Sequence, residues 1–172
     1  MERGQKEIKL MKGWQYLLSG IGLIALVIQL VPNELPPTET NNPGDLIESG
    51  IVSIEVAGLL RTSCYDCHSN ETKFPWYSYV APFSWLVAKD VKDARKELNF
   101  SVWQDYDMME KLEKLDDISI EVKEGEMPMP IYTAIHTSAK LSDAQRQLIV
   151  QWAEDAMDIV VEEDEESGPE EG

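Results

Sequence analysis

The sequence contains few cysteines, few histidines and few basic residues. Its 172 residues include two cysteines and two histidines, and 15 lysines and arginines oppose 32 aspartates and glutamates, for a formal net charge of −17. A disulfide between Cys64 and Cys67 would close only a very short loop, and a zinc site would lack some of its usual four ligands. The acidic balance argues against nucleic acid as a partner, because phosphates repel carboxylates.

The sequence also lacks the alternating apolar pattern of strands, internal repeats, and any acid/base pair, phosphate loop or nucleophile constellation. Its apolar residues recur at helical spacing instead, which predicts an all-α fold. Four helices are expected, and their apolar faces are Val52, Val56, Leu59 and Leu60; Val87, Val91, Ala94 and Leu98; Met108, Leu112 and Leu115; and Leu148, Trp152 and Ile159. The second starts near Pro82 and carries charged residues on its other side, and the third is stopped by Gly125. The fourth follows a capping box of Ser142 and Gln145.

A long uncharged run extends from Gly13 to Asn33, after a segment, residues 1–12, with four basic and two acidic residues. As a helix the run is long enough to cross a hydrocarbon core of about 30 Å. The basic residues before it keep the amino end in the cytoplasm and place the rest outside. We expect an uncleaved single-pass anchor of the cytoplasmic (inner) membrane at 13–33. A cleaved signal peptide is the main alternative, although residues 29–34 offer no small-x-small cleavage site.

The remaining chain has room for one further domain. Residues 34–50 are rich in proline and asparagine and predict an extended linker, and residues 51–160 hold the helical pattern. Residues 161–172 predict a disordered acidic tail, which contributes seven of the seventeen net negative charges. Such a tail would suit a partner with a basic surface, and a solvated tail that aids solubility is the simpler explanation.

Both cysteines lie in the motif Cys64-Tyr65-Asp66-Cys67-His68. This spacing is typical of covalent haem attachment, in which each thiol binds one vinyl group and the histidine ligates the iron from the proximal side. A redox dithiol needs no histidine at that place and is the main alternative. The predicted topology puts the cysteines on the oxidising side of the membrane, where haem attachment is expected. We therefore predict one haem c on Cys64, Cys67 and His68.

Aromatic residues follow the motif closely. We expect Trp76, Tyr77, Phe83 and Trp85 to wall the haem pocket, with ordinary core packing as the alternative for each. The core of so small a domain is then largely the macrocycle itself.

The distal iron ligand must come from residues further along the chain. Met127 and Met129 lie in a loop rich in glycine and proline, and a thioether opposite histidine raises the reduction potential, as an electron carrier requires. Met127 is favoured. Met129 or His136 is the alternative, the latter giving a bis-histidine site, and an open distal position remains a further possibility.

Several segments resemble the bacterial haem-binding domain family of membrane-anchored, c-type-cytochrome-like proteins. They are Ser63–Thr72, Phe74–Ser78, Ala81–Trp85, Leu98–Trp103 and Gly125–Pro128, with the spacing on to Tyr132, His136, Ala139 and Leu141. The similarity covers residues 52–152. It implies haem c bound through Cys64, Cys67 and His68, and Met127 as the distal ligand, because the family pattern there is Glu-Met-Pro. Met129 departs from that pattern and leaves a second thioether beside the first.

Two functions agree with these features. The first is a monohaem electron-transfer protein, a small cytochrome c-like helical domain preceded by a single transmembrane helix, which exchanges electrons with an unidentified redox partner protein outside the cytoplasmic membrane. The second is a haem-based sensor or small peroxidase, which needs a displaceable distal ligand. We favour the carrier over the enzyme.

Overall fold

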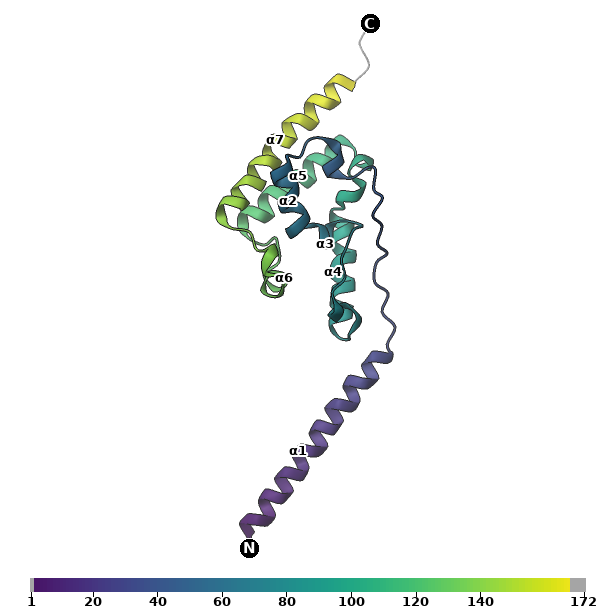
Figure 1. Cartoon of the computed structure of the whole chain (residues 1–172), viewed down its shortest axis with the longest axis vertical. Helices are drawn as coiled ribbons and strands as arrows, with labels where there is room; N and C mark the ends of the chain where they lie inside the picture. Colours follow the sequence, from purple (N-terminus) through teal and green to yellow (C-terminus); the bar gives the residue numbers. More distant parts are fainter. Residues whose placement is uncertain (1, 168–172) are drawn as a thin grey trace. The chain divides into compact units, whose positions relative to one another are not determined.

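A computed structural model describes residues 2–167 of the chain, and it confirms the all-α fold (Figure 1). The described residues form α-helices and short 3-10 helices and no strand. The α-helices are α1 (Glu2–Val27), α2 (Ile54–Ser63), α3 (Tyr65–His68), α4 (Phe83–Glu97), α5 (Met108–Glu124), α6 (Pro130–Ile135) and α7 (Asp143–Ser167). The 3-10 helices are η1 (Ile28–Leu30), η2 (Leu46–Ser49), η3 (Trp76–Tyr79), η4 (Phe100–Asp105) and η5 (Thr137–Ala139).

The chain divides into two compact units. Unit 1 contains Met1–Pro36 and Phe74–Lys89, and unit 2 contains Pro37–Lys73 and Asp90–Gly172. Helix α4 therefore begins in unit 1 and ends in unit 2.

The core of unit 2 is built where α5 and α7 pack together and α2 packs against α7. Helix α5 buries Leu115, Ile118 and Val122, and α7 buries Ile149, Trp152, Ala153, Ala156 and Val160. The α7 residues recur three or four positions apart and so lie on one helix face. The sequence places Ile159 on that face, which is wrong: Ile159 is 37% exposed, and its neighbour Val160 is buried instead.

The ends of the long helices follow local side-chain chemistry. Ser142 and Gln145 form the expected capping box before α7, with the Ser142 N–H donating to Gln145 Oε1 at 2.9 Å. Asp107 and Glu110 form another before α5, which the sequence reading overlooked. Helix α5 stops at Gly125, as predicted, because that residue adopts a φ of 83°, which a side chain disfavours.

The structure differs from the prediction at both ends of the domain. The last part of the expected linker belongs to unit 2, since Asp45 and Leu46 are almost fully buried and Leu46 joins the hydrophobic core. At the other end α7 continues to Ser167, so residues 161–167 are helical where a disordered tail is predicted, in keeping with the high helix propensity of glutamate. Residues 168–172 of the predicted tail lie outside the described residues.

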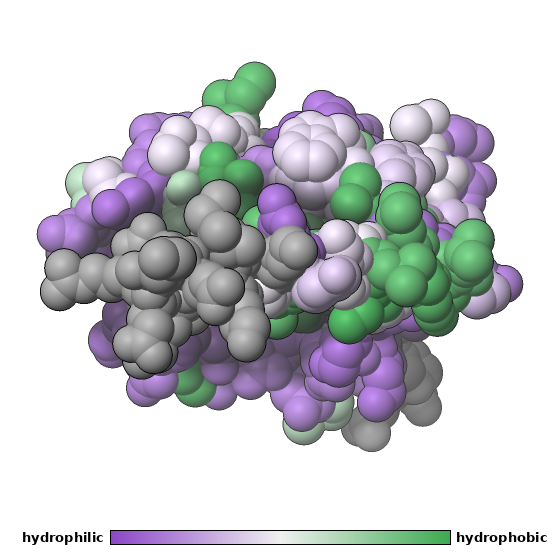
Figure 2. Space-filling model, turned by 90° about the horizontal axis from the view of Figure 1, so that it is seen from below, coloured by the Kyte–Doolittle hydropathy of each residue, from purple (hydrophilic) through white to green (hydrophobic). Residues whose placement is uncertain are grey.

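Unit 1 contains α1, whose apolar part is exposed. The segment Gly13–Leu30 of α1 has a mean hydropathy of 1.5 and no buried residue. Within the described part of the chain, α1 is the one helix that is long and apolar enough to cross a membrane. Figure 2, a view from below, shows apolar residues in green on the surface of the molecule. Length and composition thus make α1 a candidate anchor.

Candidate functional site

The cysteine motif lies where α2 gives way to α3. Ser53 caps α2 by accepting a hydrogen bond from the Val56 N–H at 3.3 Å. Val56 and Leu60 are fully buried in the core, and the Cys64 N–H donates to the Leu60 carbonyl at 2.9 Å. The buried face of α2 therefore fixes the position at which Cys64 leads into α3.

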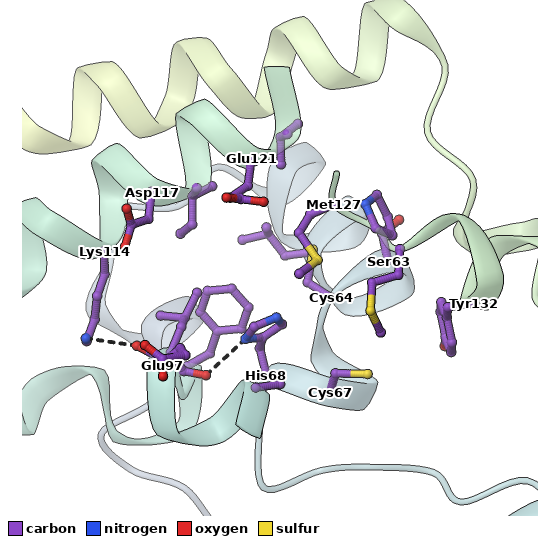
Figure 3. Close-up of a pocket in the computed structure, with 18 of the residues that line it drawn as sticks. Ser63, Cys64, Cys67, His68, Glu97, Lys114, Asp117, Glu121, Met127 and Tyr132 are labelled. Atoms are coloured by element: carbon purple, nitrogen blue, oxygen red, sulfur yellow. Dashed lines mark hydrogen bonds between the residues drawn. The ribbon is translucent and has the colours of Figure 1, made fainter. Parts of the chain in front are cut away.

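A cavity of about 460 Å³ adjoins the motif, and all the residues that line it belong to unit 2 (Figure 3). The lining residues are Leu60, Ser63, Cys64, Cys67, His68, Asp90, Asp93, Ala94, Glu97, Leu98, Phe100, Lys114, Asp117, Ile118, Glu121, Val122, Met127, Pro128, Met129 and Tyr132. Its volume is within the range of about 300–1,000 Å³ that is usual for cofactor sites. The chain thus brings Cys64, Cys67, His68, Met127 and Met129 to one space.

These residues fit a haem. Leu60, Leu98, Phe100, Ile118 and Val122 give the cavity apolar walls, which an extended porphyrin ring requires. Two thiols, one imidazole and two thioethers accompany them, and these are the donors found at c-type haem sites.

His68 is held in the tautomer that binds metal. Its Nδ1 lies 3.1 Å from the Leu98 carbonyl oxygen, and because a carbonyl only accepts, Nδ1 carries the proton. The lone pair of Nε2 is then available for iron, as in other metal sites with a second partner behind the imidazole. Burial lowers the pKa of His68, although hydrogen bonds to the Leu98 and Ala94 backbone oppose this. The ring is therefore neutral at pH 7, the form that ligates iron.

The thiols of Cys64 and Cys67 are weak acids and are protonated at pH 7. Burial raises the pKa of Cys64 to about 12, and burial and the charges of Asp66 and Asp90 raise that of Cys67 to about 11. Both cysteines are free. Reactive dithiols have a lowered pKa instead, because the thiolate is their nucleophile. This environment disfavours the redox-dithiol reading of the motif.

The loop after α5 carries both candidate methionines, and Arg146 of α7 holds it. Arg146 Nη1 donates to the carbonyl oxygens of Met127 at 2.9 Å and Val122 at 3.0 Å. The Met127 N–H donates in turn to the Glu121 carbonyl at 3.1 Å. In Figure 3 Met127 lies beside the same space as Cys64 and His68. Which methionine is the distal ligand stays a prediction.

His136 is not among the residues that line the cavity. Its ring stacks on Tyr132, with centroids 4.3 Å apart and planes at 14°. Tyr132 does line the cavity, and its hydroxyl donates to Asp66 Oδ2 at 2.8 Å. The contact links α6 to the cysteine motif and places His136 one ring away from the cavity.

The four aromatic residues expected to wall the haem lie in the other unit. Trp76, Tyr77, Phe83 and Trp85 belong to unit 1, whereas the cavity lining comes from unit 2. Trp76 is 78% and Phe83 58% exposed. Their role at the haem stays a prediction that the cavity lining does not support.

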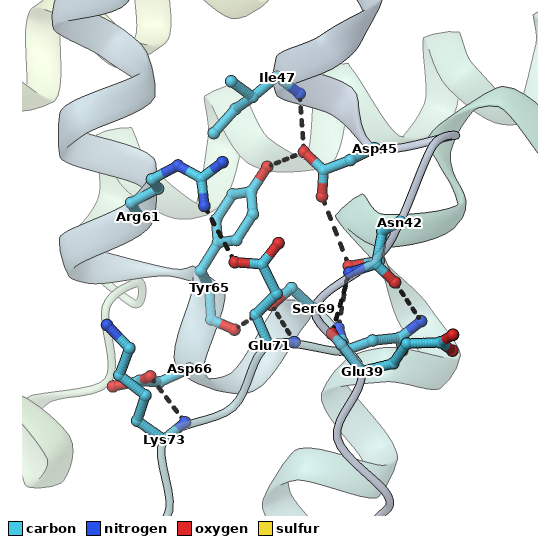
Figure 4. A network of polar contacts seen from close by, with 12 residues as sticks. Glu39, Asn42, Asp45, Ile47, Arg61, Tyr65, Asp66, Ser69, Glu71 and Lys73 are labelled. Carbon is cyan, nitrogen blue, oxygen red and sulfur yellow. Dashed lines mark hydrogen bonds and ion pairs between the residues drawn. The ribbon is translucent and has the colours of Figure 1, made fainter.

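A different aromatic residue, Phe100, borders the cavity, and the sequence reading gave it no role in the pocket. Its ring stacks on Tyr65 at 5.1 Å and lies 6.2 Å from the His68 ring. The Tyr65 hydroxyl donates to the buried Asp45 at 2.7 Å, within a network of polar contacts (Figure 4). Phe100 lies in the segment Leu98–Trp103, which resembles the family, and this resemblance is the signal in the sequence that could have identified Phe100 as a pocket residue.

Acidic residues also line the cavity: Asp90, Asp93 and Glu97 on α4, and Asp117 and Glu121 on α5. The sequence reading assigned the α4 charges only to the side away from the apolar face. Among the described residues that line the cavity, Lys114 is the one lysine, and there is no arginine. Its Nζ donates a hydrogen bond to the Glu97 carbonyl at 3.0 Å. The cavity therefore combines apolar walls with a strongly acidic border.

Comparisons with known proteins agree with this chemistry. The model of the haem-binding domain family matches residues 23–155. The chain is 30% identical over 102 residues to cytochrome c peroxidase Ccp of Escherichia coli strain K12, an overlap of 57% of this chain and 22% of that much longer protein. No solved structure matches. Because the family model covers well over half of the chain, and the cavity supplies the donors that haem requires, this protein belongs to the haem-binding domain family.

Proposed function

We propose that this protein is a membrane-anchored, monohaem, c-type-cytochrome-like electron carrier. Cys64 and Cys67 hold the haem through thioether bonds, and His68 ligates the iron from the proximal side. The haem supplies reversible one-electron chemistry, and the chain sets its potential and its access to solvent.

The observation that carries the proposal is the environment of His68. Leu98 fixes its tautomer at 3.1 Å, so Nε2 is presented for metal in a cavity that both thiols also border. Both thiols are free and border that cavity, as attachment to the two vinyl groups of one haem requires.

Met127 is the proposed distal ligand. It borders the cavity and packs against the hydrophobic core, and Arg146 holds its carbonyl at 2.9 Å. A held thioether favours ferrous iron and raises the potential, which an electron carrier uses. Met129 also borders the cavity and is the alternative, whereas His136 would first have to leave its stacking contact with Tyr132.

The apolar part of α1 is the proposed anchor in the cytoplasmic membrane. The exposed window Gly13–Leu30 and the basic residues of segment 1–12 support a single pass with the haem domain on the periplasmic, or extracytoplasmic, side. The redox partner is then a protein on that side. A basic partner surface suits both the net charge of −17 and the acidic border of the cavity.

Covalent attachment is tested on the purified full-length protein after denaturation. Haem that stays with the wild-type chain in a denaturing gel, and is lost from a variant with both Cys64→Ala and Cys67→Ala, is the expected result. A Tyr65→Phe variant, which keeps both thiols, serves as the matched control and should retain the haem. Haem that remained covalently bound without either thiol would overturn the proposal.

A haem sensor or small peroxidase is the second candidate, and the similarity to a cytochrome c peroxidase favours it. That function needs a distal position that opens. The visible spectrum of the ferrous protein with carbon monoxide separates the two: rapid binding indicates a sensor or peroxidase, and an unchanged low-spin spectrum indicates a carrier.

A further inference from the structure

A second uncharged segment follows the haem motif in the sequence. Residues 74–88 contain no charged side chain, in a chain whose net charge is −17, and six of these fifteen residues are aromatic. Lys73 and Lys89 lie immediately before and after the segment. Such a composition is unusual for a solvated surface of an acidic protein.

Much of this segment is exposed. Trp76 is 78%, Tyr79 68%, Phe83 58% and Leu86 45% accessible, so η3 and the first turn of α4 present large apolar groups outward. The segment is nevertheless ordered from within, because Ser78, Ala81 and Ser84 are buried. Its apolar side chains thus lie on a folded scaffold that displays them.

Hydrogen bonds tie this scaffold to the end of the candidate anchor, within unit 1. The Gln29 side chain makes a reciprocal pair with the Ala81 backbone: its Nε2 donates to the Ala81 carbonyl at 3.1 Å, and its Oε1 accepts from the Ala81 N–H at 3.0 Å. Asn33 Nδ2 donates to the Ser84 carbonyl at 3.0 Å. Gln29 lies in η1, at the end of the apolar window Gly13–Leu30. The aromatic segment is therefore fixed at the point where the chain would leave the hydrocarbon.

We propose that residues 74–86 form an interfacial element that inserts its aromatic side chains into the headgroup region of the bilayer in which α1 is anchored. Tryptophan and tyrosine favour this region because their rings are apolar and their N–H and O–H groups can remain hydrated. Lys73 and Lys89 flank the uncharged residues 74–88, and lipid phosphates favour positive charge beside such a segment. The proposal rests on the membrane anchor of the proposed function, and it explains the exposure of Trp76 and Phe83, which the haem cavity leaves unexplained.

Photocrosslinking of the full-length, haem-loaded chain in vesicles of phosphatidylethanolamine and phosphatidylglycerol tests the proposal. The photoreactive residue p-benzoylphenylalanine replaces one residue at a time: Phe83 or Tyr79 in the segment, Ile24 in the anchor, and Met109 in unit 2. The last two are matched controls, because Ile24 is 63% and Met109 65% exposed, close to the 58% of Phe83. Lipid adducts on the chain are then measured by mass spectrometry.

We expect lipid adducts at Ile24, Phe83 and Tyr79 in yields several-fold above those at Met109. Adducts at Ile24 with none above the Met109 level at Phe83 and Tyr79 would overturn the interfacial element and leave the anchor intact. Adducts of Phe83 and Tyr79 with the haem or with unit 2 instead of lipid would overturn it too, in favour of a haem wall. Absence of lipid adducts at Ile24 as well would overturn the anchor, and the interfacial element with it.

Discussion

Replacing Arg146 by glutamine tests whether the loop that carries Met127 controls the distal side of the iron. One guanidinium nitrogen of Arg146 donates to the carbonyls of Met127 and Val122, at 2.9 and 3.0 Å. Hydrogen bonds from a charged donor contribute about 1.5–3 kcal/mol each when buried, and this side chain is only partly buried. We therefore expect a loss of about 2 kcal/mol for the two bonds together. In a domain of this size that lowers Tm by about 10 °C.

The same loss has a consequence for ligand exchange. If the 2 kcal/mol comes from the closed state of the loop, the population with Met127 away from the cavity rises about 30-fold, since 1.4 kcal/mol corresponds to tenfold. Carbon monoxide must wait for the distal ligand to leave, so its binding rate to the ferrous protein should rise by up to that factor. Stopped-flow mixing measures this rate. Arg146→Lys keeps the charge and should fall between the wild type and Arg146→Gln.

Lys140→Gln provides the control. Lys140 is exposed just before α7, and its substitution removes one positive charge, as Arg146→Gln does. It should change neither Tm nor the rate. A lower Tm in Arg146→Gln with an unchanged carbon monoxide rate would refute the reasoning, since it would show that the loop held by Arg146 does not carry the distal ligand.

Three further predictions use spectra, pH and membrane association. The far-red charge-transfer band of a ferric sulfur–iron bond should disappear in Met127→Ala and survive in Met129→Ala and His136→Ala; loss in Met129→Ala alone would move the ligand two residues along. Haem-free protein should lose stability as the pH rises above about 9 toward 12. Burial raises the pKa of the Cys64 thiol from 9.0 to about 12, so in this range the folded state keeps a proton that the unfolded state releases. Chemical denaturation across this range should show the loss in the wild type and a flatter profile when Cys64 and Cys67 are both alanine; identical profiles would contradict the raised pKa. Full-length protein should stay in the membrane fraction after a carbonate wash, whereas a soluble chain that starts near residue 35 would show that the segment is a cleaved signal.

The sequence predicts the helices well where local chemistry sets their ends. Ser142 with Gln145 marks the start of α7, and Gly125 marks the end of α5, because a cap or a left-handed residue acts within a few positions of itself. Ile159 shows the limit of helical spacing alone. A shift of one position separates it from the buried Val160, and only the packing of α7 against α5 decides between them.

The sequence predicts two parts of the cavity lining, the cysteine motif and the loop with Met127 and Met129. Cys64, Cys67 and His68 lie within five consecutive residues, so the sequence alone is enough to recognise the motif. Phe100, Ile118 and Val122 reach the same cavity from sites 30 or more residues away, through the packing of η4 and α5. The aromatic residues after the motif were assigned to the haem because they are close in sequence. Their segment belongs to unit 1 with α1, where Gln29 and Asn33 bind the backbone of Ala81 and Ser84 through hydrogen bonds that no periodicity indicates. Their role at the haem stays a prediction.

If Met127 ligates the iron as proposed, the choice between an electron carrier and a peroxidase would depend on how firmly its loop is held. Arg146 binds the loop at Met127, and beyond the loop Tyr132 binds Asp66 of the attachment motif at 2.8 Å. A closed loop would keep the Met127 thioether in place to hold the iron and would favour electron transfer, and an open loop would leave room for a small molecule instead. Both proposed functions would use the same His68, cavity and thiols. Similarity over 22% of a peroxidase favours the second function only weakly, so the carbon monoxide rates of the Arg146 variants are the sharper test of the two proposals.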